Sequence, residues 1–154
     1  GAGKTQLIKE LLLAHSNSVG GCYIEEVMEN GKRMGFRIKN FTGGNEIFIY
    51  KGMESAVKLN KYGIDLKILE NIGVKSMAEA LENKKLIVVD ELGTIECMSD
   101  YFRETLANCL ASGKNVLATI RHQSKPFTQE VQKMADTKMV LLTKENFFFI
   151  FDKE

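Results

Sequence analysis

Gly1-Ala2-Gly3-Lys4-Thr5 opens the chain, and the residues that follow, Gln6-Leu7-Ile8-Lys9-Glu10-Leu11-Leu12-Leu13, carry apolar side chains at helical spacing. Gly-x-Gly-Lys-Thr at the start of a helix is the second half of the phosphate-binding P-loop, or Walker A motif, G-x-x-x-x-G-K-[ST]. In this motif backbone N–H groups and the helix N-terminus face the phosphates. The first glycine of the motif would lie three residues before Gly1, after an apolar strand. We therefore expect that this sequence is trimmed at its N-terminus.

The bulk composition limits the classes of protein and of partner. The chain has 154 residues, which suit a single domain over 1–154. A net charge of +1 gives no large basic field, which argues against nucleic acid as a partner. No apolar run approaches the roughly 20 residues that cross a bilayer, which argues against a membrane. Cys22, Cys97 and Cys109 lack C-x-x-C spacing, so we expect reduced thiols in a cytoplasmic protein. We also expect the protein to be a monomer.

A second informative stretch is Leu86-Ile87-Val88-Val89-Asp90-Glu91-Leu92-Gly93. Its apolar run predicts a strand buried on both faces of a parallel sheet. Together with a P-loop this is a Walker B pattern, in which Lys4 reaches the β- and γ-phosphates while Thr5 and Asp90 hold Mg²⁺. The alternative is that Asp90 only caps the turn after the strand. We expect the strand upstream of Gly1 to lie in the middle of the sheet, beside the Asp90 strand.

Three further residues are candidates for the reaction itself. Glu91 can polarise a water in line with the γ-phosphate, which favours hydrolysis over transfer to a bound acceptor; the alternative is a solvated strand-end residue. Glu96 is a weaker candidate for the same role. Arg121 follows the apolar strand 115–120, at the end where ligands bind in doubly wound sheets. It either stabilises γ-phosphate charge or is a solvated loop arginine.

The rest of the chain alternates strands and helices. We predict an α/β fold with a mostly parallel sheet flanked by helices and an antiparallel meander after the P-loop helix. Asn30-Gly31 predicts a type I′ turn in this meander, and charges on its arms, such as Glu25 and Arg37, predict cross-strand ion pairs. The predicted strands are 22–29, 32–40, 46–50, 86–91, 115–120 and 138–142, and the predicted helices are 5–15, 64–72, 76–83, 99–112 and 127–134. We expect 16–21 to be a turn, 51–63 a loop, and 147–151 either a strand or the start of a helix.

Two of the predicted helices carry capping signals. Ser76 has Glu79 at capping-box distance, and Ser99 or Asp100 caps the helix that ends before Gly113. The stripe expected to be buried on the second of these helices consists of Tyr101, Phe102, Thr105, Leu106, Cys109 and Leu110.

With these elements in place, the chain resembles the nucleoside-triphosphatase type 1 family of small P-loop NTPases. The matching segments, in order, are 1–5, 21–27 with 31–36, 62–66, 89–96 and 116–120. The resemblance implies a RecA-like P-loop fold and hydrolysis of nucleoside triphosphates such as ATP and GTP to diphosphate and phosphate, with Mg²⁺ and loose base preference. Carried over by position, it implies that Gly1 to Thr5 bind phosphates and that Leu86 to Gly93 form the second nucleotide-contacting segment. We also expect Gln6, directly after the P-loop, to contact the nucleotide.

The expected activity is therefore that of a hydrolase with Lys4, Glu91 and Arg121 as catalytic residues. An arginine finger is worth about 10³–10⁵ in rate, so we expect slow turnover unless Arg121 or a partner supplies one. Two alternatives remain open. One is a small-molecule kinase, although the only candidate lid, 121–125, contains a single arginine. The other is a nucleotide-dependent binding switch, of which the near-neutral charge disfavours an RNA-binding version.

Overall fold

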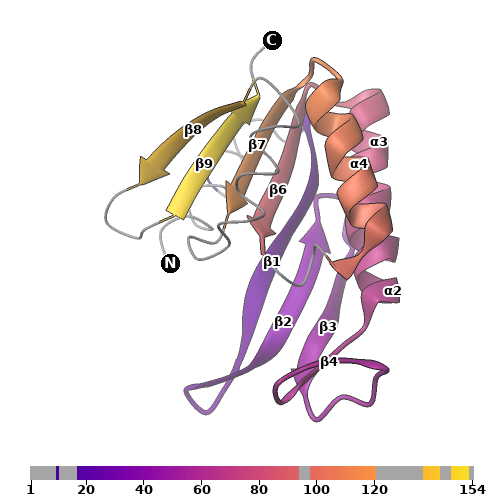
Figure 1. The fold of residues 1–154 in the computed structure, drawn as a ribbon, viewed down its shortest axis with the longest axis vertical. Coiled ribbons are helices and arrows are strands. Elements are labelled where there is room, and N and C mark those ends of the chain that lie inside the picture. Colours follow the sequence, from indigo (N-terminus) through magenta and orange to yellow (C-terminus); the bar gives the residue numbers. More distant parts are fainter. Residues whose placement is uncertain (1–9, 11–16, 94–97, 121–136, 143–146, 153–154) are drawn as a thin grey trace.

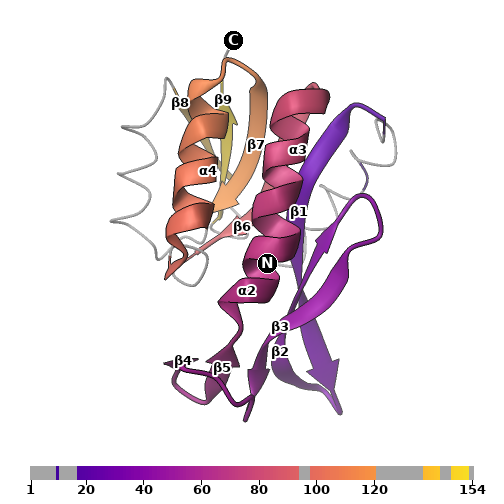
Figure 2. The same cartoon turned by 90° about the vertical axis from the view of Figure 1, so that its right-hand side faces the viewer.

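The computed structural model of the chain describes residues 10, 17–93, 98–120, 137–142 and 147–152. Within these residues nine strands form one sheet, and helices cover one of its faces (Figure 1, Figure 2). The strands in spatial order are β4 (Val57–Leu59), β5 (Tyr62–Ile64), β3 (Asn45–Lys51), β2 (Lys32–Asn40), β1 (Val19–Glu29), β6 (Leu86–Leu92), β7 (Asn115–Ile120), β9 (Phe147–Asp152) and β8 (Thr137–Leu142). The helical segments are α2 (Leu66–Ile68), η1 (Leu69–Val74), α3 (Lys75–Asn83) and α4 (Asp100–Ala111).

Parallel pairing lies in the middle of this sheet. β1 pairs in parallel with β6, and β6 with β7, whereas the described pairs on both flanks are antiparallel. The sheet thus joins a parallel α/β centre to the predicted meander. Because β1 and β7 occupy both sides of β6, the expectation that an upstream strand lies beside the Asp90 strand is wrong.

The predicted meander is confirmed as β1, β2 and β3. Asn30 and Gly31 both have positive φ, 52° and 75°, as a type I′ turn requires. β1 begins at Val19, however, so the turn predicted for 16–21 is wrong for residues 19–21, which belong to the strand. Gly21 explains the difference, because its φ is 114° and an added Cβ would lie 1.9 Å from the carbonyl oxygen of Val88. A glycine is needed for β1 to lie this close to β6.

The segment 51–63, predicted to be a loop, contains a small hairpin. β4 and β5 pair antiparallel, and β5 also pairs with β3. Asn60, in the turn between β4 and β5, has a φ of 54°. Each of the two strands has three residues, which is too short for a period-two pattern to be recognised in the sequence.

One continuous helical segment replaces the two helices predicted at 64–72 and 76–83. Asp65 caps it, because its side chain accepts hydrogen bonds from the N–H groups of Lys67 and Ile68 at 3.0 and 3.2 Å. α2 continues into η1, a π-helical turn, and η1 continues into α3. The residues at which the sequence pattern predicts a break lie in this π turn or directly after it, and they are helical.

Ser76 therefore lies inside a helix, and the prediction that it is an N-cap is wrong. Its hydroxyl accepts a hydrogen bond from Asn40 Nδ2 at 3.0 Å and so joins α3 to the end of β2. Gly73, which suggests a helix break, lies in the π turn, where an added Cβ would be 3.0 Å from Ile38 Cδ1. This glycine allows the helix to approach the sheet closely.

α4 follows the prediction except at two residues of the stripe, Tyr101 and Thr105, of which Thr105 is only half-buried. Ser99 caps it by accepting a hydrogen bond from the N–H of Phe102 at 3.1 Å, and Gly113 follows its end with a φ of 81°. Tyr101, predicted to be buried, is 66% exposed. Adjacent helical residues point about 100° apart, and here Phe102 takes the position that faces the core.

The C-terminal strands lie on the flank opposite the meander. The strand predicted at 138–142 is β8, and of the two alternatives for 147–151 the structure has a strand, β9. β9 pairs antiparallel with both β7 and β8. The helix predicted at 127–134 and most of the one predicted at 5–15 lie outside the described residues.

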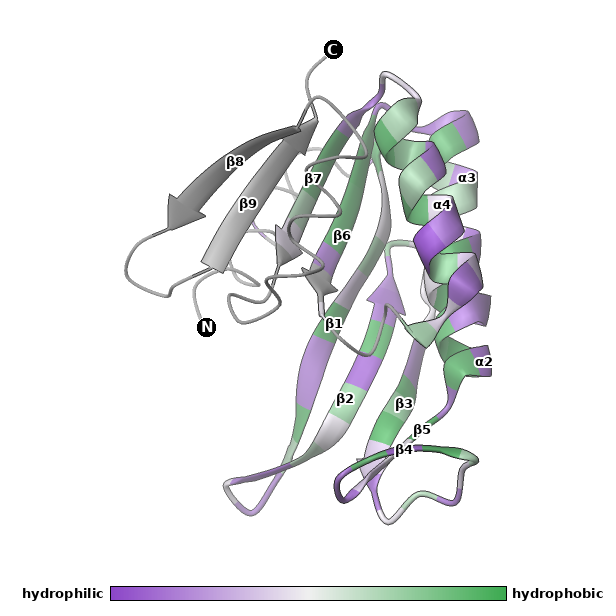
Figure 3. Cartoon of the chain, in the orientation of Figure 1, coloured by the Kyte–Doolittle hydropathy of each residue, from purple (hydrophilic) through white to green (hydrophobic). Residues whose placement is uncertain are grey.

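The core that holds the site strands in place lies between the helical layer and the sheet. Apolar side chains of β1, β2, β3, β6 and β7 meet those of η1, α3 and α4, and Figure 3 shows hydrophobic residues along β6 and β7. Ile38, Phe48, Met77 and Phe102 are among its largest fully buried side chains. Among the described helices none is long and apolar enough to cross a membrane.

Candidate functional site

Asp90 is the predicted site residue that the structure places most clearly. It lies toward the carboxyl end of β6 and is 1% exposed. The hydroxyl of Thr119, fully buried on the neighbouring strand β7, donates a hydrogen bond to Asp90 Oδ1. A buried carboxylate is unfavourable unless it is paired or hydrogen-bonded. Thr119 therefore stabilises the ionised form of Asp90 and fixes the direction of its side chain.

The side chains of Asp90 and Thr119 lie on the sheet face opposite the described helices. Val89 and Ala118, the residues just before them, belong to the core under α3 and α4. Successive side chains of a strand point to opposite faces, so Asp90 and Thr119 point away from that core. Thr119 was not among the predicted site residues, although a hydroxyl near the carboxyl end of an apolar strand is a signal of this kind of site.

Polar residues of neighbouring strands continue this face beyond Asp90. In the register of the sheet, Asp90 is opposite Tyr23 of β1, and Tyr23 is opposite Lys39 of β2. The ring of Tyr23 stacks on Phe41, with 5.2 Å between the ring centroids. Lys39 Nζ lies 3.2 Å from a carboxylate oxygen of Glu25. The stacked aromatic pair and the ion pair thus each join β1, the strand beside β6, to the end of β2, the next strand.

The ion pairing predicted for the hairpin arms is present with a different cation. Glu25 is opposite Arg37 in the register, yet its ion pair is with Lys39, two residues further along β2. Arg37 donates a hydrogen bond to Asn45 Oδ1 on β3 at 2.8 Å. Lys39 was not predicted as the partner of Glu25, because the partner of a charged residue depends on side-chain directions, which the pairing register alone does not fix.

Some predicted site residues lie outside the part of the chain that the structure describes. They are the P-loop residues Gly1–Gln6, Glu96 and Arg121. The contacts of Lys4 and Thr5 with phosphates and metal therefore stay predictions.

The second predicted nucleotide segment, Leu86–Gly93, does lie within the described residues. Its strand is β6, and Ile87, Val88 and Val89 are at most 1% exposed, as expected for a strand covered on both faces. The backbone of Glu91 continues β6, but its side chain is not among the described ones. The strand that carries the predicted Walker B carboxylates is confirmed.

Asp90 can hold a metal ion as a single carboxylate ligand. The described residues contain no cluster of three or more His, Cys, Asp or Glu side chains that could hold one. Mg²⁺ needs no such cluster, because it binds through one or two carboxylates and takes water and phosphate oxygens as its other ligands. The hard oxygen donors of Asp90 fit this ion.

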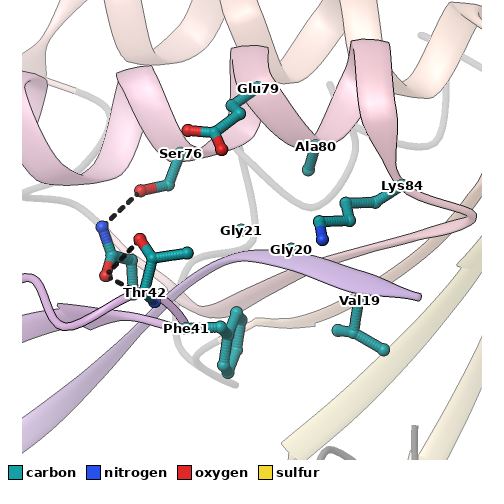
Figure 4. Close-up of a pocket in the computed structure, with 10 residues that line it drawn as sticks. Val19, Gly20, Gly21, Phe41, Thr42, Ser76, Glu79, Ala80 and Lys84 are labelled. Carbon is teal, nitrogen blue, oxygen red and sulfur yellow. Dashed lines mark hydrogen bonds between the residues drawn. The ribbon is translucent and has the colours of Figure 1, made fainter. Parts of the chain in front are cut away.

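A small pocket lies toward the opposite, amino-terminal end of β1 (Figure 4). The start of β1, the turn after β2 and one side of α3 line it, with Gly20, Thr42, Ser76, Glu79 and Lys84 among its residues. Its volume of about 40 Å³ has room for a few water molecules. Small-molecule sites have about 300–1,000 Å³. We therefore do not assign nucleotide binding to this pocket.

Comparison with known proteins identifies the family. A family model described as NTPase matches residues 1–153. The chain belongs to this NTPase family. Among its curated members, nucleoside-triphosphatase THEP1 of Thermotoga sp. (strain RQ2) is 40% identical over 146 residues, which cover 95% of this chain and 83% of that protein. Nucleoside-triphosphatase THEP1 of Thermofilum pendens is 33% identical over 152 residues, which cover 95% and 84%.

Solved structures of the family share the fold. The crystal structure of THEP1 from the hyperthermophile Aquifex aeolicus has a TM-score of 0.78 and 29% identity, and the match covers 94% of this chain and 86% of that one. The solution structure of a human cancer-related nucleoside triphosphatase has a TM-score of 0.74 and 27% identity, with 95% and 86% covered. These likenesses confirm the predicted α/β P-loop NTPase fold and the family resemblance read from the sequence.

Proposed function

We propose that this protein is a Mg²⁺-dependent nucleoside-triphosphatase that hydrolyses triphosphates such as ATP and GTP to the diphosphate and phosphate. The observation that carries the proposal is the buried Asp90, hydrogen-bonded by Thr119 at the carboxyl end of a parallel strand. Ligands of open α/β sheets bind outside the carboxyl ends of such strands. Membership of the NTPase family and the names of the relatives support hydrolysis as the reaction.

Each predicted site residue has a distinct part in this reaction. Lys4 and the P-loop amides bind the β- and γ-phosphates, and the Thr5 hydroxyl and Asp90 would hold Mg²⁺. When bound, Mg²⁺ neutralises charge on the phosphate oxygens. Glu91 accepts a proton from the attacking water, whose oxygen forms a bond to the γ-phosphorus while the bond to the β–γ bridging oxygen breaks. The products are the nucleoside diphosphate and inorganic phosphate.

Two properties follow from this set of residues. The P-loop and Asp90 contact phosphates and metal, so we expect several triphosphates to be hydrolysed with similar efficiency. Arg121 is the candidate for stabilising charge on the transferred phosphoryl group, and without such an arginine turnover is expected to be slow.

The substitution Glu91→Gln tests the assignment of the general base. We expect phosphate release to fall by about 10²–10⁴-fold, the usual contribution of a general base, while the Kd for nucleotide stays close to that of the parent enzyme. Glu104→Gln, on the exposed side of α4, is the matched control and should leave both unchanged. Unchanged turnover in the Glu91 variant would sink the assignment.

A second measurement separates hydrolysis from phosphoryl transfer. With γ-labelled ATP and an added nucleoside, we expect the label in inorganic phosphate. Label found in the nucleoside would instead support the kinase alternative.

A further inference from the structure

The ion pair of Lys39 and Glu25 lies on the same sheet face as Asp90. Asp90, Tyr23 and Lys39 are consecutive partners across β6, β1 and β2. With neighbouring strands about 4.8 Å apart, the Cα atom of Lys39 is about 10 Å from that of Asp90. A lysine side chain that leans toward β6 can span most of this distance.

The direction of the Lys39 side chain is given by its contact with Glu25. Nζ is 3.2 Å from a Glu25 oxygen, and Glu25 belongs to β1, the strand directly beside β6. The ammonium group is therefore carried from β2 toward β6. Glu25 is also two residues, or about 7 Å, beyond the register position of Asp90 in the carboxyl direction. The ammonium thus lies near the carboxyl end of β6, where β1 extends past it (Figure 1).

Arg37, the neighbouring cation on this face of β2, is directed elsewhere. Its Nη1 donates to Asn45 Oδ1 on β3 at 2.8 Å, on the side away from β1 and β6. Lys39 and Arg37 alternate with residues that face the core, so both belong to the Asp90 face. Of these two cations, Lys39 is the one that points toward the site.

Because the side chain of Lys39 is partly buried, its charge interacts more strongly with nearby charges than the charge of an exposed lysine does. The side chains of Lys39 and Glu25 are 26% and 21% exposed. Charges shielded from water interact more strongly with other charges nearby. An ammonium group has three N–H donors, so a contact with Glu25 leaves donors for phosphate oxygens.

We propose that Lys39 stabilises the negative charge on the terminal phosphate during hydrolysis and that Glu25 is the residue that positions it. The inference rests on the proposed function, because Asp90 marks where the metal and the phosphates bind. Lys39 keeps its proton throughout and acts by charge and hydrogen bonding. It takes the part that an arginine finger has in related P-loop enzymes.

Steady-state hydrolysis of Mg-ATP by the enzyme and its variants tests this role. Lys39→Met keeps the aliphatic stem, and we expect it to lower kcat about 100-fold with KM changed less than threefold, since the lost interaction strengthens in the transition state. Lys39→Arg should recover at least a tenth of the parent kcat. Lys58→Met, on the exposed part of the edge strand β4, removes the same charge elsewhere and should have the parent kcat.

Glu25→Gln tests the positioning role. We expect it to lower kcat about tenfold, and the double variant with Lys39→Met to be no slower than Lys39→Met alone, because Glu25 acts through Lys39. Additive losses in the double variant would show that the two residues act independently and would overturn the positioning role.

The remaining outcomes separate this inference from the proposed function. A folded Lys39→Met variant with the parent kcat, or with a raised KM alone, would overturn the role of Lys39. Thermal unfolding monitors folding, and Lys39→Gln replaces Lys39→Met if that variant does not fold. Asp90→Asn belongs in the same series. If Asp90→Asn is inactive while Lys39→Met is fully active, only the inference fails, whereas a fully active Asp90→Asn would refute the proposed function itself.

Discussion

Thr119→Val tests the hydrogen bond that holds Asp90. Valine has nearly the shape of threonine, so the substitution removes the hydroxyl donor without leaving a cavity. Thr119 and Asp90 are 0% and 1% exposed, so water cannot easily replace the lost bond. A hydrogen bond to a charged group contributes about 1.5–3 kcal/mol, and we expect the free energy of unfolding to fall by about this amount. For a domain of this size that corresponds to a Tm lower by about 3–12 °C.

Thr119→Ser is the matched control, since it keeps the hydroxyl and loses one methyl group, worth about 0.8 kcal/mol. Urea unfolding at pH 7 measures both variants. If Asp90 holds Mg²⁺, the loss of its hydrogen-bond donor should also raise the Mg²⁺ concentration needed for half-maximal hydrolysis about 10–100-fold in Thr119→Val. A Thr119→Val variant at least as stable as Thr119→Ser would refute the reasoning.

Four more substitutions test packing, capping and titration. Gly21→Ala should destabilise the protein by more than about 3 kcal/mol, because the added Cβ would lie 1.9 Å from a carbonyl oxygen of β6. Gly113→Ala, at φ 81° with no atom within 4 Å, should lower stability by only about 1–2 kcal/mol in the same urea titration. Ser99→Ala should cost about 1–2 kcal/mol, and a smaller loss than that of an exposed serine would contradict the capping role. Burial raises the pKa of the Cys109 thiol to about 11 from an ordinary 9.0, so the stability it contributes is complete below about pH 9 and is lost as the pH rises through 11. Thermal unfolding from pH 8 to 11 should show this fall in the parent protein and less of it in Cys109→Ser.

The elements that could be predicted from the sequence are those specified by local patterns. The apolar run before Asp90 identifies β6 without reference to any other strand. Asn30-Gly31 needs only its own backbone preference to form the hairpin turn. By contrast, β4 and β5 have three residues each and depend on pairing with β3, and the π turn at Gly73 depends on contact with the sheet. Long-range packing decides these elements, and a single sequence does not reveal it.

The site residues fall into the same two groups, those predicted from a local pattern and those decided by long-range packing. Asp90 was predicted because its strand and the P-loop form a known pair of motifs. Thr119 and Lys39 were not, because they come from strands distant along the chain, and their presence on the Asp90 face depends on the register of β7 and β2. A slip of one residue would place either side chain on the opposite face of the sheet. The composition of such a face is therefore a property of the whole sheet.

The same face bears on why water would be the phosphate acceptor. A kinase needs a site for the acceptor hydroxyl beside the terminal phosphate. On the side of Asp90 toward β1 and β2, the described residues place the Tyr23–Phe41 stack and the Glu25–Lys39 ion pair, whose groups already contact one another. A nucleoside or other acceptor bound there would need room beside the stacked rings and the ion pair, whereas a water molecule needs little space. This arrangement therefore favours hydrolysis over transfer.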